Sequence, residues 1–332
     1  MNEQQNEKQP FKFDLKDQKT RLLLVAIACL IVIAITVLSS VKDANADNTS
    51  DGDIGTLSII DAESSGGAPA PDNKTPENVS MELHVLDVGQ GDGMYIKCGD
   101  KNIVIDAGEN GNDEFVCNYL KEQGVKTIDL VIATHQHSDH IGGLDTVIKT
   151  FDCKGFMMPE VPENMIPNSV AYEKFMKAVD KKKVPYIQPC TGDIYDFDGV
   201  KMYIYDDGRG GEDLNSSSVI VKFVCGKNSF LLMADAEKSE ENRIMARGYD
   251  LKSDVLKIGH HGSSKATGEK FLDAVNPQYI AISCGANNDY GFPHREIKAM
   301  LREKGIKYFR TDLVSTIVFK SDGKNITVTT AR

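Results

Sequence analysis

The sequence lacks an excess of positive charge, and it also lacks any CxxC pair and any evident internal repeat. Its 332 residues carry a formal net charge of -11 at pH 7. Residues 1–21 carry five basic and four acidic side chains and residues 42–80 carry two and eight, which leaves -6 on residues 81–332. A body with this balance has no general attraction for nucleic acid or anionic lipid. A phosphate-bearing substrate would therefore need a local site, such as bound metal ions.

The seven cysteines are widely scattered, and Cys29 lies in an apolar segment apart from the other six. Six cysteines in an exported domain would permit disulfides. Their spacing, mostly inside apolar stretches, fits buried free thiols equally well. We predict no specific disulfide.

An uncharged run of twenty residues, LLLVAIACLIVIAITVLSSV, occupies positions 22–41. As a helix it would be about 30 Å long, enough to cross the hydrocarbon core of a bilayer. Basic residues precede it (Lys12, Lys16, Lys19 and Arg21) and the following segment is acidic, so the N-terminus should be cytoplasmic. We expect a cytoplasmic tail (1–21), a single transmembrane anchor (22–41) and an extracellular body at the cell membrane.

Two alternatives to the uncleaved anchor remain. Ala44-Asn45-Ala46 resembles a signal-peptide cleavage site, and cleavage would give a secreted protein. The apolar run is longer than a typical signal core, however, and the segment before it is long. Cys29 resembles a lipoprotein site only weakly, because the hydrophobic run continues well past it.

Residues 42–80 are rich in Asp, Asn, Ser, Gly and Pro, which is typical of a flexible linker. Short apolar runs typical of strands then appear in two blocks within 81–332, and each block is followed by alternating strands and helices. We expect helices near 114–123, 168–181, 267–275 and 294–304, and a closing hairpin around Asp322-Gly323. The pattern predicts one α+β domain, an αββα sandwich, behind the transmembrane helix.

The stretch THQHSDH (134–140) places three histidines and an aspartate within seven positions. It follows the apolar run Leu130–Ala133 directly. At a strand end alternate residues point the same way, so His135 and His137 should converge on one point, while Asp139 and His140 face a second point. Imidazole and carboxylate ligands suit Zn²⁺ or Mn²⁺. A solvated histidine-rich loop is the alternative, and the position between a strand and a glycine-led helix disfavours it.

Two later apolar runs also end in residues that favour metals. Asp235 ends FLLMAD, and His260-His261 follow DVLKIG. Strand ends present side chains to a cleft. Asp235 alone would be equally acceptable as a turn residue. Taken with the histidine cluster, these stretches predict a split site for up to two ions.

The chain resembles the metallo-β-lactamase superfamily, and within it the extracellular hydrolase domain of ComEC-type DNA-internalisation competence proteins. Many separated motifs match in order, across nearly all of 81–332: LDVGQGDG (86–93), NIVIDAG (102–108), THQHSDHIGG (134–143), NSSSVIV (215–221), FLLMADAE (230–237), DVLKIGHHGSS (254–264), ISCGANNDYGFPH (282–294) and FRTD (309–312). The resemblance implies the metallo-β-lactamase fold for this domain.

The resemblance also implies roles for individual residues. His135 and His137 would hold one metal, Asp139 and His140 the other, and Asp235 would bridge them. Either His260 or His261 would complete the second site, and the other could act on the substrate. Candidate catalytic residues are Asp139, His260, His261 and Asp106, the last as a carboxylate that orients a cluster histidine. Candidate substrate-binding residues are Asp92, Asn215, Ser218 and His294, with Lys265 and Arg310 as further candidate phosphate contacts.

The chain departs from the family pattern in three places. No histidine occurs between 141 and 234, where the superfamily has another ligand for the first metal. Competence-type proteins have an asparagine-containing stretch there, similar to Asn215–Ser218, so the first metal should be weakly held and favour Mn²⁺ or partial Zn²⁺ occupancy. Phe292 replaces the first histidine of a YGHPH pattern. One expected membrane helix cannot form the channel of the competence proteins.

We therefore expect a membrane-anchored extracellular metal-dependent hydrolase, phosphodiesterase- or nuclease-like, that uses a metal-bound hydroxide on DNA or a small phosphodiester. One alternative is hydrolysis of an ester, lactone or β-lactam. The other is a non-catalytic competence-accessory binding ectodomain. The intact cluster and Asp235 favour catalysis, because a binding module has no need of them.

Overall fold

The computed structural model describes residues 79–332. The expected tail (1–21), the anchor (22–41) and nearly all of the linker (42–80) lie outside the described residues. Among residues 79–332, no helix is long and apolar enough to span a bilayer.

The first of two large sheets has seven strands in the order β16-β15-β1-β2-β3-β5-β7. Strands β1 to β3 pair antiparallel, and β5 and β7 continue the sheet in parallel. The bounds are β1 (Met81–Val85), β2 (Gly93–Cys98), β3 (Lys101–Ala107), β5 (Leu130–Ile132), β7 (Phe156–Met157), β15 (Ile317–Ser321) and β16 (Ile326–Thr330).

The second sheet has seven strands in the order β14-β13-β12-β11-β10-β9-β8 and repeats this design. Strands β8 to β11 pair antiparallel, and β11 to β14 pair in parallel. The bounds are β8 (Ile194–Phe197), β9 (Val200–Asp206), β10 (Ile220–Cys225), β11 (Asn228–Leu232), β12 (Val255–Lys257), β13 (Tyr279–Ile282) and β14 (Lys307–Arg310). The two blocks seen in the sequence are thus two sheets of similar construction.

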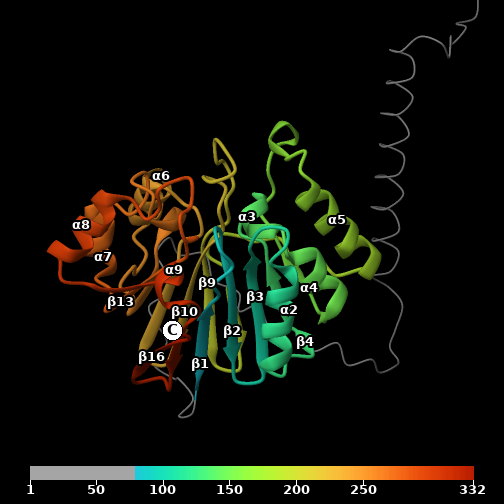
Figure 1. The fold of residues 1–332 in the computed structure, drawn as a ribbon, viewed down its shortest axis with the longest axis horizontal. Coiled ribbons are helices and arrows are strands. Elements are labelled where there is room, and N and C mark those ends of the chain that lie inside the picture. The colour runs from blue at the N-terminus through green and yellow to red at the C-terminus, as the bar shows by residue number, and fades with distance from the viewer. Residues whose placement is uncertain (1–78) are drawn as a thin grey trace, which may run out of the picture. The chain divides into compact units, whose positions relative to one another are not determined.

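Helices cover the outer face of each sheet (Figure 1). The first sheet carries α2 (Asp113–Glu122), α3 (Ser138–Ile141), α4 (Leu144–Thr150) and α5 (Val170–Lys182), with η2 (Glu163–Met165) before α5. The second carries α6 (Lys238–Ala246), α7 (Glu269–Val275) and α8 (Arg295–Glu303), and η3 (Gly259–Gly262) and α9 (Thr311–Val314) follow β12 and β14. The expected helices near 114–123, 168–181, 267–275 and 294–304 are confirmed.

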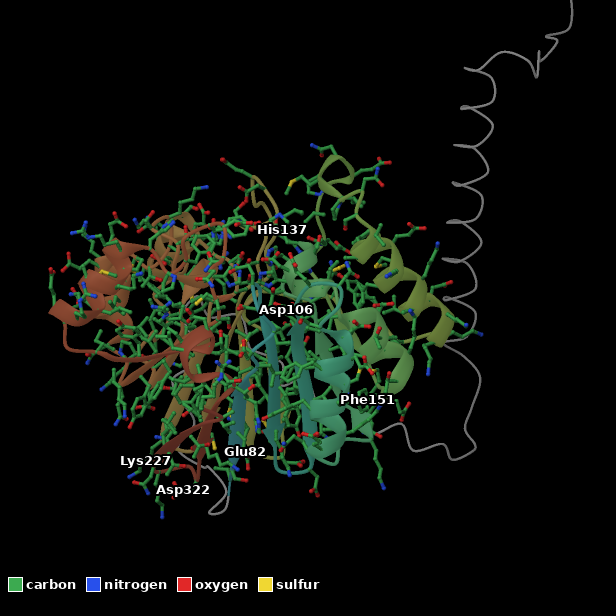
Figure 2. The ribbon with its side chains drawn as sticks, viewed as in Figure 1. Glu82, Asp106, His137, Phe151, Lys227 and Asp322 are labelled. Carbon is green, nitrogen blue, oxygen red and sulfur yellow. The ribbon has the colours of Figure 1, made fainter. Side chains whose placement is uncertain are left out.

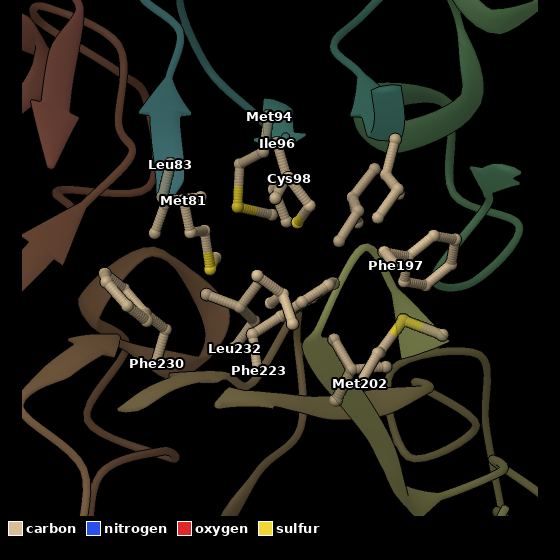
Figure 3. Close-up of a cluster of buried hydrophobic side chains, with 14 of the residues drawn as sticks. Met81, Leu83, Met94, Ile96, Cys98, Phe197, Met202, Phe223, Phe230 and Leu232 are labelled. Atoms are coloured by element: carbon tan, nitrogen blue, oxygen red, sulfur yellow. The ribbon is translucent and has the colours of Figure 1, made fainter. Parts of the chain in front are cut away.

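The core between the sheets is built by strict alternation of apolar residues. On β11, Phe230 and Leu232 point into this inner core, whereas Leu231 packs beneath the helices of the second sheet. Figure 3 shows the inner core, with Met81, Leu83 and Met94 facing Phe230 and Leu232 across the interface. One apolar cluster thus lies between the two sheets, and two others lie between each sheet and its helices. The four layers confirm the predicted αββα sandwich. The sheets are mixed, because helices connect their parallel strands.

The last two strands form the hairpin that the sequence predicts. Strand β15 pairs with β16 and also with β1, both antiparallel. The C-terminal hairpin therefore extends the first sheet, although it follows the second sheet in the chain.

One predicted strand is divided. The run TIDLVIAT forms β4 (Thr127–Ile128) and β5, with Asp129 between them. The Asp129 carboxylate accepts a hydrogen bond from the Asn102 backbone N–H at 2.9 Å and pairs with Lys154 Nζ at 2.9 Å. Strand β4 pairs with β6 (Asp152–Cys153) instead of joining the large sheet. All six cysteines in the described part of the chain are free thiols.

Candidate metal centre

The residues with metal-ligating side chains follow the ends of parallel strands from both sheets. The segment THQHSDH follows β5 of the first sheet, whereas Asp235 follows β11 and His261 follows β12 of the second. Figure 2 shows His137 at the upper end of the sandwich, with Asp106 below it. The site therefore draws on both halves of the fold.

His135, His137 and Asp235 form the first group of ligand atoms, all within 4.8 Å of one another. His135 Nε2 lies 2.9 Å from His137 Nδ1 and 3.9 Å from Asp235 Oδ2. The two histidines converge as the alternation at a strand end predicts.

Asp139, His140 and His261 form the second group. His261 Nε2 lies 3.5 Å from Asp139 Oδ2, and His140 Nε2 lies 4.0 Å from the same oxygen. Asp235 Oδ1 is 3.4 Å from both of these Nε2 atoms. Asp235 thus faces the first group with one oxygen and the second group with the other, the arrangement expected of a shared carboxylate.

The donor atoms of the second group fit a divalent cation. His140 Nε2, His261 Nε2 and Asp235 Oδ1 are buried and have no hydrogen-bond partner. Buried polar atoms in folded proteins are normally paired. Imidazole nitrogens and carboxylate oxygens that converge in this way form the ligand set preferred by Zn²⁺ and also accepted by Mn²⁺.

The structure separates the two adjacent histidines that the sequence could not. His261 is buried within the second group. His260 lies nearer the surface, where its Nδ1 is 3.1 Å from Glu237 Oε1 and its Nε2 is 3.7 Å from Asp235 Oδ2. Both residues adopt positive φ angles, 44° and 53°, a strained conformation that turns the consecutive rings to different surroundings.

Asp106 fixes the orientation of His140. Its carboxylate lies 2.8 Å from His140 Nδ1 and accepts hydrogen bonds from the Thr134 backbone N–H at 2.9 Å and the Thr134 hydroxyl at 2.6 Å. A proton on Nδ1 leaves Nε2 free to bind a metal. The structure thus brings Asp106 to the position expected of it, behind a cluster histidine.

The acidic surroundings raise the pKa values of the two second-group histidines. Burial alone lowers the pKa of His140, but the carboxylates of Asp235, Asp106 and Asp139 hold it well above its usual range. Burial also opposes the shift at His261, where the same kind of carboxylate field raises the pKa to about 9. Because metal ligation requires neutral imidazole, a cation that binds here must release these protons.

His135 shows the opposite behaviour. Burial, followed by the charge of His140, lowers its pKa well below the usual value. The imidazole of His135 is therefore neutral and ready to act as a ligand without losing a proton.

The GQGDG loop brings a buried ion pair to the site. Lys257 Nζ lies 2.9 Å from each carboxylate oxygen of Asp92, and both side chains are fully buried. Asp92 Oδ1 also lies 3.5 Å from His261 Nδ1. The carboxylate of Asp92 is thus buried and paired with Lys257, and its contact with substrate stays a prediction. Sequence reasoning missed Lys257, although a lysine inside the apolar run DVLKIG was an available signal.

The position of Gly91 in this loop requires a glycine. Its φ is +118°, and a Cβ at this position would lie 2.0 Å from the backbone oxygen of Asp139. The same oxygen accepts a hydrogen bond from the Asp92 backbone N–H at 3.1 Å. Only glycine allows the loop to pack this closely on the histidine cluster.

The stretch that replaces the absent histidine lies beside the first group. Asn215 lies close enough to His137 to favour the charged form of its imidazole, although burial lowers the pKa of His137 overall. Asn215 Oδ1 is buried and has no hydrogen-bond partner, so this oxygen is available to a cation. Ser218 is fully buried, and its hydroxyl accepts a hydrogen bond from the Asp235 backbone N–H at 3.2 Å. Its hydroxyl thus holds the segment that carries Asp235, and its contact with substrate stays a prediction.

The remaining candidate contacts are already engaged. His294 Nδ1 accepts a hydrogen bond from the Ser264 backbone N–H at 2.8 Å, and its Nε2 lies 3.2 Å from the Tyr290 carbonyl oxygen. It links two loops, and its contact with substrate stays a prediction. Arg310 donates to both carboxylate oxygens of Asp312, at 3.0 and 2.6 Å. Lys265 is 71% exposed, with Nζ 3.7 Å from Glu237 Oε1.

The four-layer αββα sandwich, with two groups of histidine and aspartate side chains at one end, is typical of metal-dependent hydrolases. The family model of the metallo-beta-lactamase superfamily matches residues 86–285, and the chain belongs to that superfamily.

The chain is also similar to individual proteins of known name. The chain is 28% identical over 258 residues to ComE operon protein 3 of Bacillus subtilis, across 72% of this chain and 33% of that protein. It is 26% identical over 242 residues to exodeoxyribonuclease YycJ of Bacillus anthracis, across 68% of this chain and 91% of the relative. The chain thus spans about a third of the length of the competence-type relative.

Among solved structures, the metallo-beta-lactamase fold protein YhfI from Bacillus subtilis superposes with a TM-score of 0.50 at 13% identity. The match covers 73% of this chain and 100% of that one. At this identity the likeness concerns the fold alone.

Proposed function

We propose that the chain is a membrane-anchored extracellular phosphodiesterase of nuclease-like character that acts at this centre. The observation that carries the proposal is the convergence of His140 Nε2, His261 Nε2 and Asp235 Oδ1, three buried donor atoms without partners. The similarity to an exodeoxyribonuclease and to a competence operon protein supports phosphodiesters over other substrates.

In this proposal two ligand sets share Asp235. His135 and His137 would hold one ion together with Asn215 Oδ1, and Asp139, His140 and His261 would hold the other. Divalent ions in such a pair act as Lewis acids on an anionic ester and lower the pKa of bound water.

The chain's own residues keep this arrangement in place. Asp106 fixes His140, the Ser283 carbonyl accepts a hydrogen bond from His261 Nδ1 at 3.1 Å, and Ser218 holds the Asp235 backbone. His260 stands at the rim with Nδ1 against Glu237, so its Nε2 is the atom available to hold a proton for a leaving oxygen.

The proposed location and substrate follow from the sequence. The uncharged run 22–41 with its basic flank supports a single membrane anchor, and a secreted form after cleavage is the alternative. The charge of -6 on residues 81–332 disfavours tight binding of duplex DNA. Single-stranded DNA or a small phosphodiester fits the acidic body better.

The test uses the full-length chain in detergent, stripped of metal and reloaded with Mn²⁺ or Zn²⁺. Substrates are single-stranded DNA, bis-p-nitrophenyl phosphate and nitrocefin. We expect metal-dependent hydrolysis of the two phosphodiesters, and a loss of about 100-fold or more in Asp139→Asn and His261→Ala.

Asp145→Asn is the matched control, since this carboxylate follows the same motif but pairs with Lys149 on α4. It should retain turnover and metal content. Hydrolysis of nitrocefin alone would transfer the proposal to lactams. If none of the three substrates is hydrolysed with either metal, the proposal that the chain is an enzyme is refuted.

A further inference from the structure

Two aromatic rings are stacked at the surface beside the metal centre. The Tyr290 and Phe292 rings lie 5.3 Å apart between centroids, with an angle of 10° between their planes. Tyr290 is 64% exposed, although a tyrosine ring has much apolar area to bury. One face of this pair is thus presented to solvent in a nearly parallel stack.

The Phe292 ring also contacts both candidate catalytic histidines, at interplanar angles of 63° to His260 and 37° to His261. The Phe292 ring centroid lies 5.4 Å from that of His260 and 5.9 Å from that of His261. A ligand that lies on these rings would therefore be next to the ligand groups. Phe292 is also the position at which the chain departs from the pattern of its family.

The loop that carries the rings is held in one conformation by its own side chains. The Asn288 amide donates to the carbonyl oxygens of Gly285 at 2.9 Å and Phe292 at 2.8 Å, and its oxygen accepts from the Phe292 backbone N–H at 2.9 Å. His294 ties Tyr290 to Ser264, on the loop that follows His261. Such a fixed pair can receive a flat ligand with little loss of conformational entropy.

We propose that Tyr290 and Phe292 form the platform on which a nucleobase next to the scissile phosphodiester stacks. The inference rests on the proposed function and names the residues that recognise that substrate. Every base has a π-face, so stacking on aromatic side chains gives affinity without sequence preference. It also suits an acidic domain, because the attraction does not depend on overall positive charge.

Two exposed cationic side chains flank the residues that are linked by the hydrogen bond between Ser264 and His294. Lys265 is 71% exposed and follows the His261 segment, and Arg295 is exposed and directly follows His294. In this proposal the aromatic rings bind the base, and a few nearby positive charges bind the phosphates.

The experiment compares two phosphodiesters that share a leaving group. Thymidine 5′-p-nitrophenyl phosphate carries a base, and methyl p-nitrophenyl phosphate does not. For the full chain loaded with Mn²⁺, the ratio of kcat/KM for the thymidine ester to that for the methyl ester is expected to fall about tenfold in Tyr290→Ala. Tyr290→Phe, which keeps the ring, should preserve the ratio.

Phe115→Ala is the matched control. Phe115 is also an exposed aromatic residue (41%) that touches another ring, but it lies on α2 against Tyr119. Its removal should leave the ratio unchanged. An unchanged ratio in Tyr290→Ala, or an equal fall in Phe115→Ala, would overturn the platform.

A second readout does not depend on catalysis. Fluorescence anisotropy of labelled oligo(dT) and of an abasic oligonucleotide of equal length measures binding to the metal-free chain. Tyr290→Ala should weaken oligo(dT) about tenfold and erase the preference over the abasic strand. If the wild type hydrolyses no phosphodiester, the proposed function fails, and this preference alone decides whether the rings bind bases. Equal binding of the two strands by the wild type would refute the platform.

Discussion

Lys257 and Asp92 form an ion pair that joins the two halves of the sandwich, with Nζ 2.9 Å from each carboxylate oxygen. Lys257 ends β12 of the second sheet, and Asp92 belongs to the loop between β1 and β2 of the first. Burial alone would raise the pKa of Asp92, but the Lys257 ammonium, together with His261, holds it below its usual range. The pair is therefore charged, dry and in contact with a candidate metal ligand.

Removal of one partner should be costly. Lys257→Met leaves the Asp92 carboxylate buried without its ammonium, and the free energy of unfolding should fall by about 3–5 kcal/mol. Urea denaturation of the metal-free protein measures this. Lys177→Met removes an equally long lysine from an exposed pair with Glu173 on α5 and should unfold like the wild type. Equal midpoints for the two variants would contradict a structural role for the buried pair.

Asp106→Asn should weaken metal binding without the loss of any ligand. The Asp106 carboxylate accepts hydrogen bonds from His140 Nδ1 and from two Thr134 donors. A neutral amide has one acceptor oxygen and no negative charge, so it holds His140 less firmly. Affinity for the second ion should fall about 10- to 100-fold. Chelator competition provides the measurement. Asp129→Asn changes a buried carboxylate that precedes β5, at the strand end opposite the histidine cluster, and bonds the Asn102 backbone, so this variant should bind metal normally.

Asn215→His should strengthen the first site. Asn215 lies beside His137, and its buried Oδ1 has no hydrogen-bond partner. An imidazole there would replace a hard oxygen donor with a nitrogen donor, which favours Zn²⁺ over Mn²⁺. Metal analysis after dialysis against mixed ions should show a higher Zn²⁺ to Mn²⁺ ratio in the variant. A lower total metal content would instead show that the oxygen of Asn215 cannot be replaced by a ring.

Glu241 should give stability a distinct pH dependence. It is buried on α6 and accepts hydrogen bonds from the backbone N–H groups of Thr267 and Gly268. Burial raises its pKa to about 7 from 4.5. The folded chain holds this proton more tightly than the unfolded chain, so the stabilisation is complete below pH 4.5 and is lost as pH rises to 7.

Between pH 4.5 and 8 the free energy of unfolding of the wild type should therefore fall, relative to Glu241→Gln, by roughly 3 kcal/mol. Urea titrations at several pH values measure both proteins under the same metal-free conditions. Glu122→Gln, at the exposed end of α2, should follow the wild-type curve. Parallel curves for the wild type and Glu241→Gln would show that the carboxyl is ionised throughout.

Strand ends were the part of the site that the sequence could predict. Apolar runs that stop at THQHSDH, at Asp235 and at the His260-His261 pair mark where strands deliver side chains to one edge. Period-two alternation then places His135 and His137 together. These signals are local, so a single sequence contains them.

Contacts between distant segments were beyond such reasoning. His261 joins the second ligand group and His260 does not, because both residues adopt positive φ angles. The residue types at these positions do not predict such angles. The pairing of Asp92 with Lys257 joins positions 165 residues apart, so no local pattern reveals it. The hydrogen bond from the Asp235 backbone to the Ser218 hydroxyl is hidden for the same reason, since only the fold brings the two segments together.

The division of the ligands between the sheets has a consequence for assembly. His135 to His140 come from one half, and Asp235 and His261 come from the other, so neither half alone holds a complete ligand set. Bound ions would cross-link the halves. Chelation would then loosen the seam between the sheets before it disturbed either sheet.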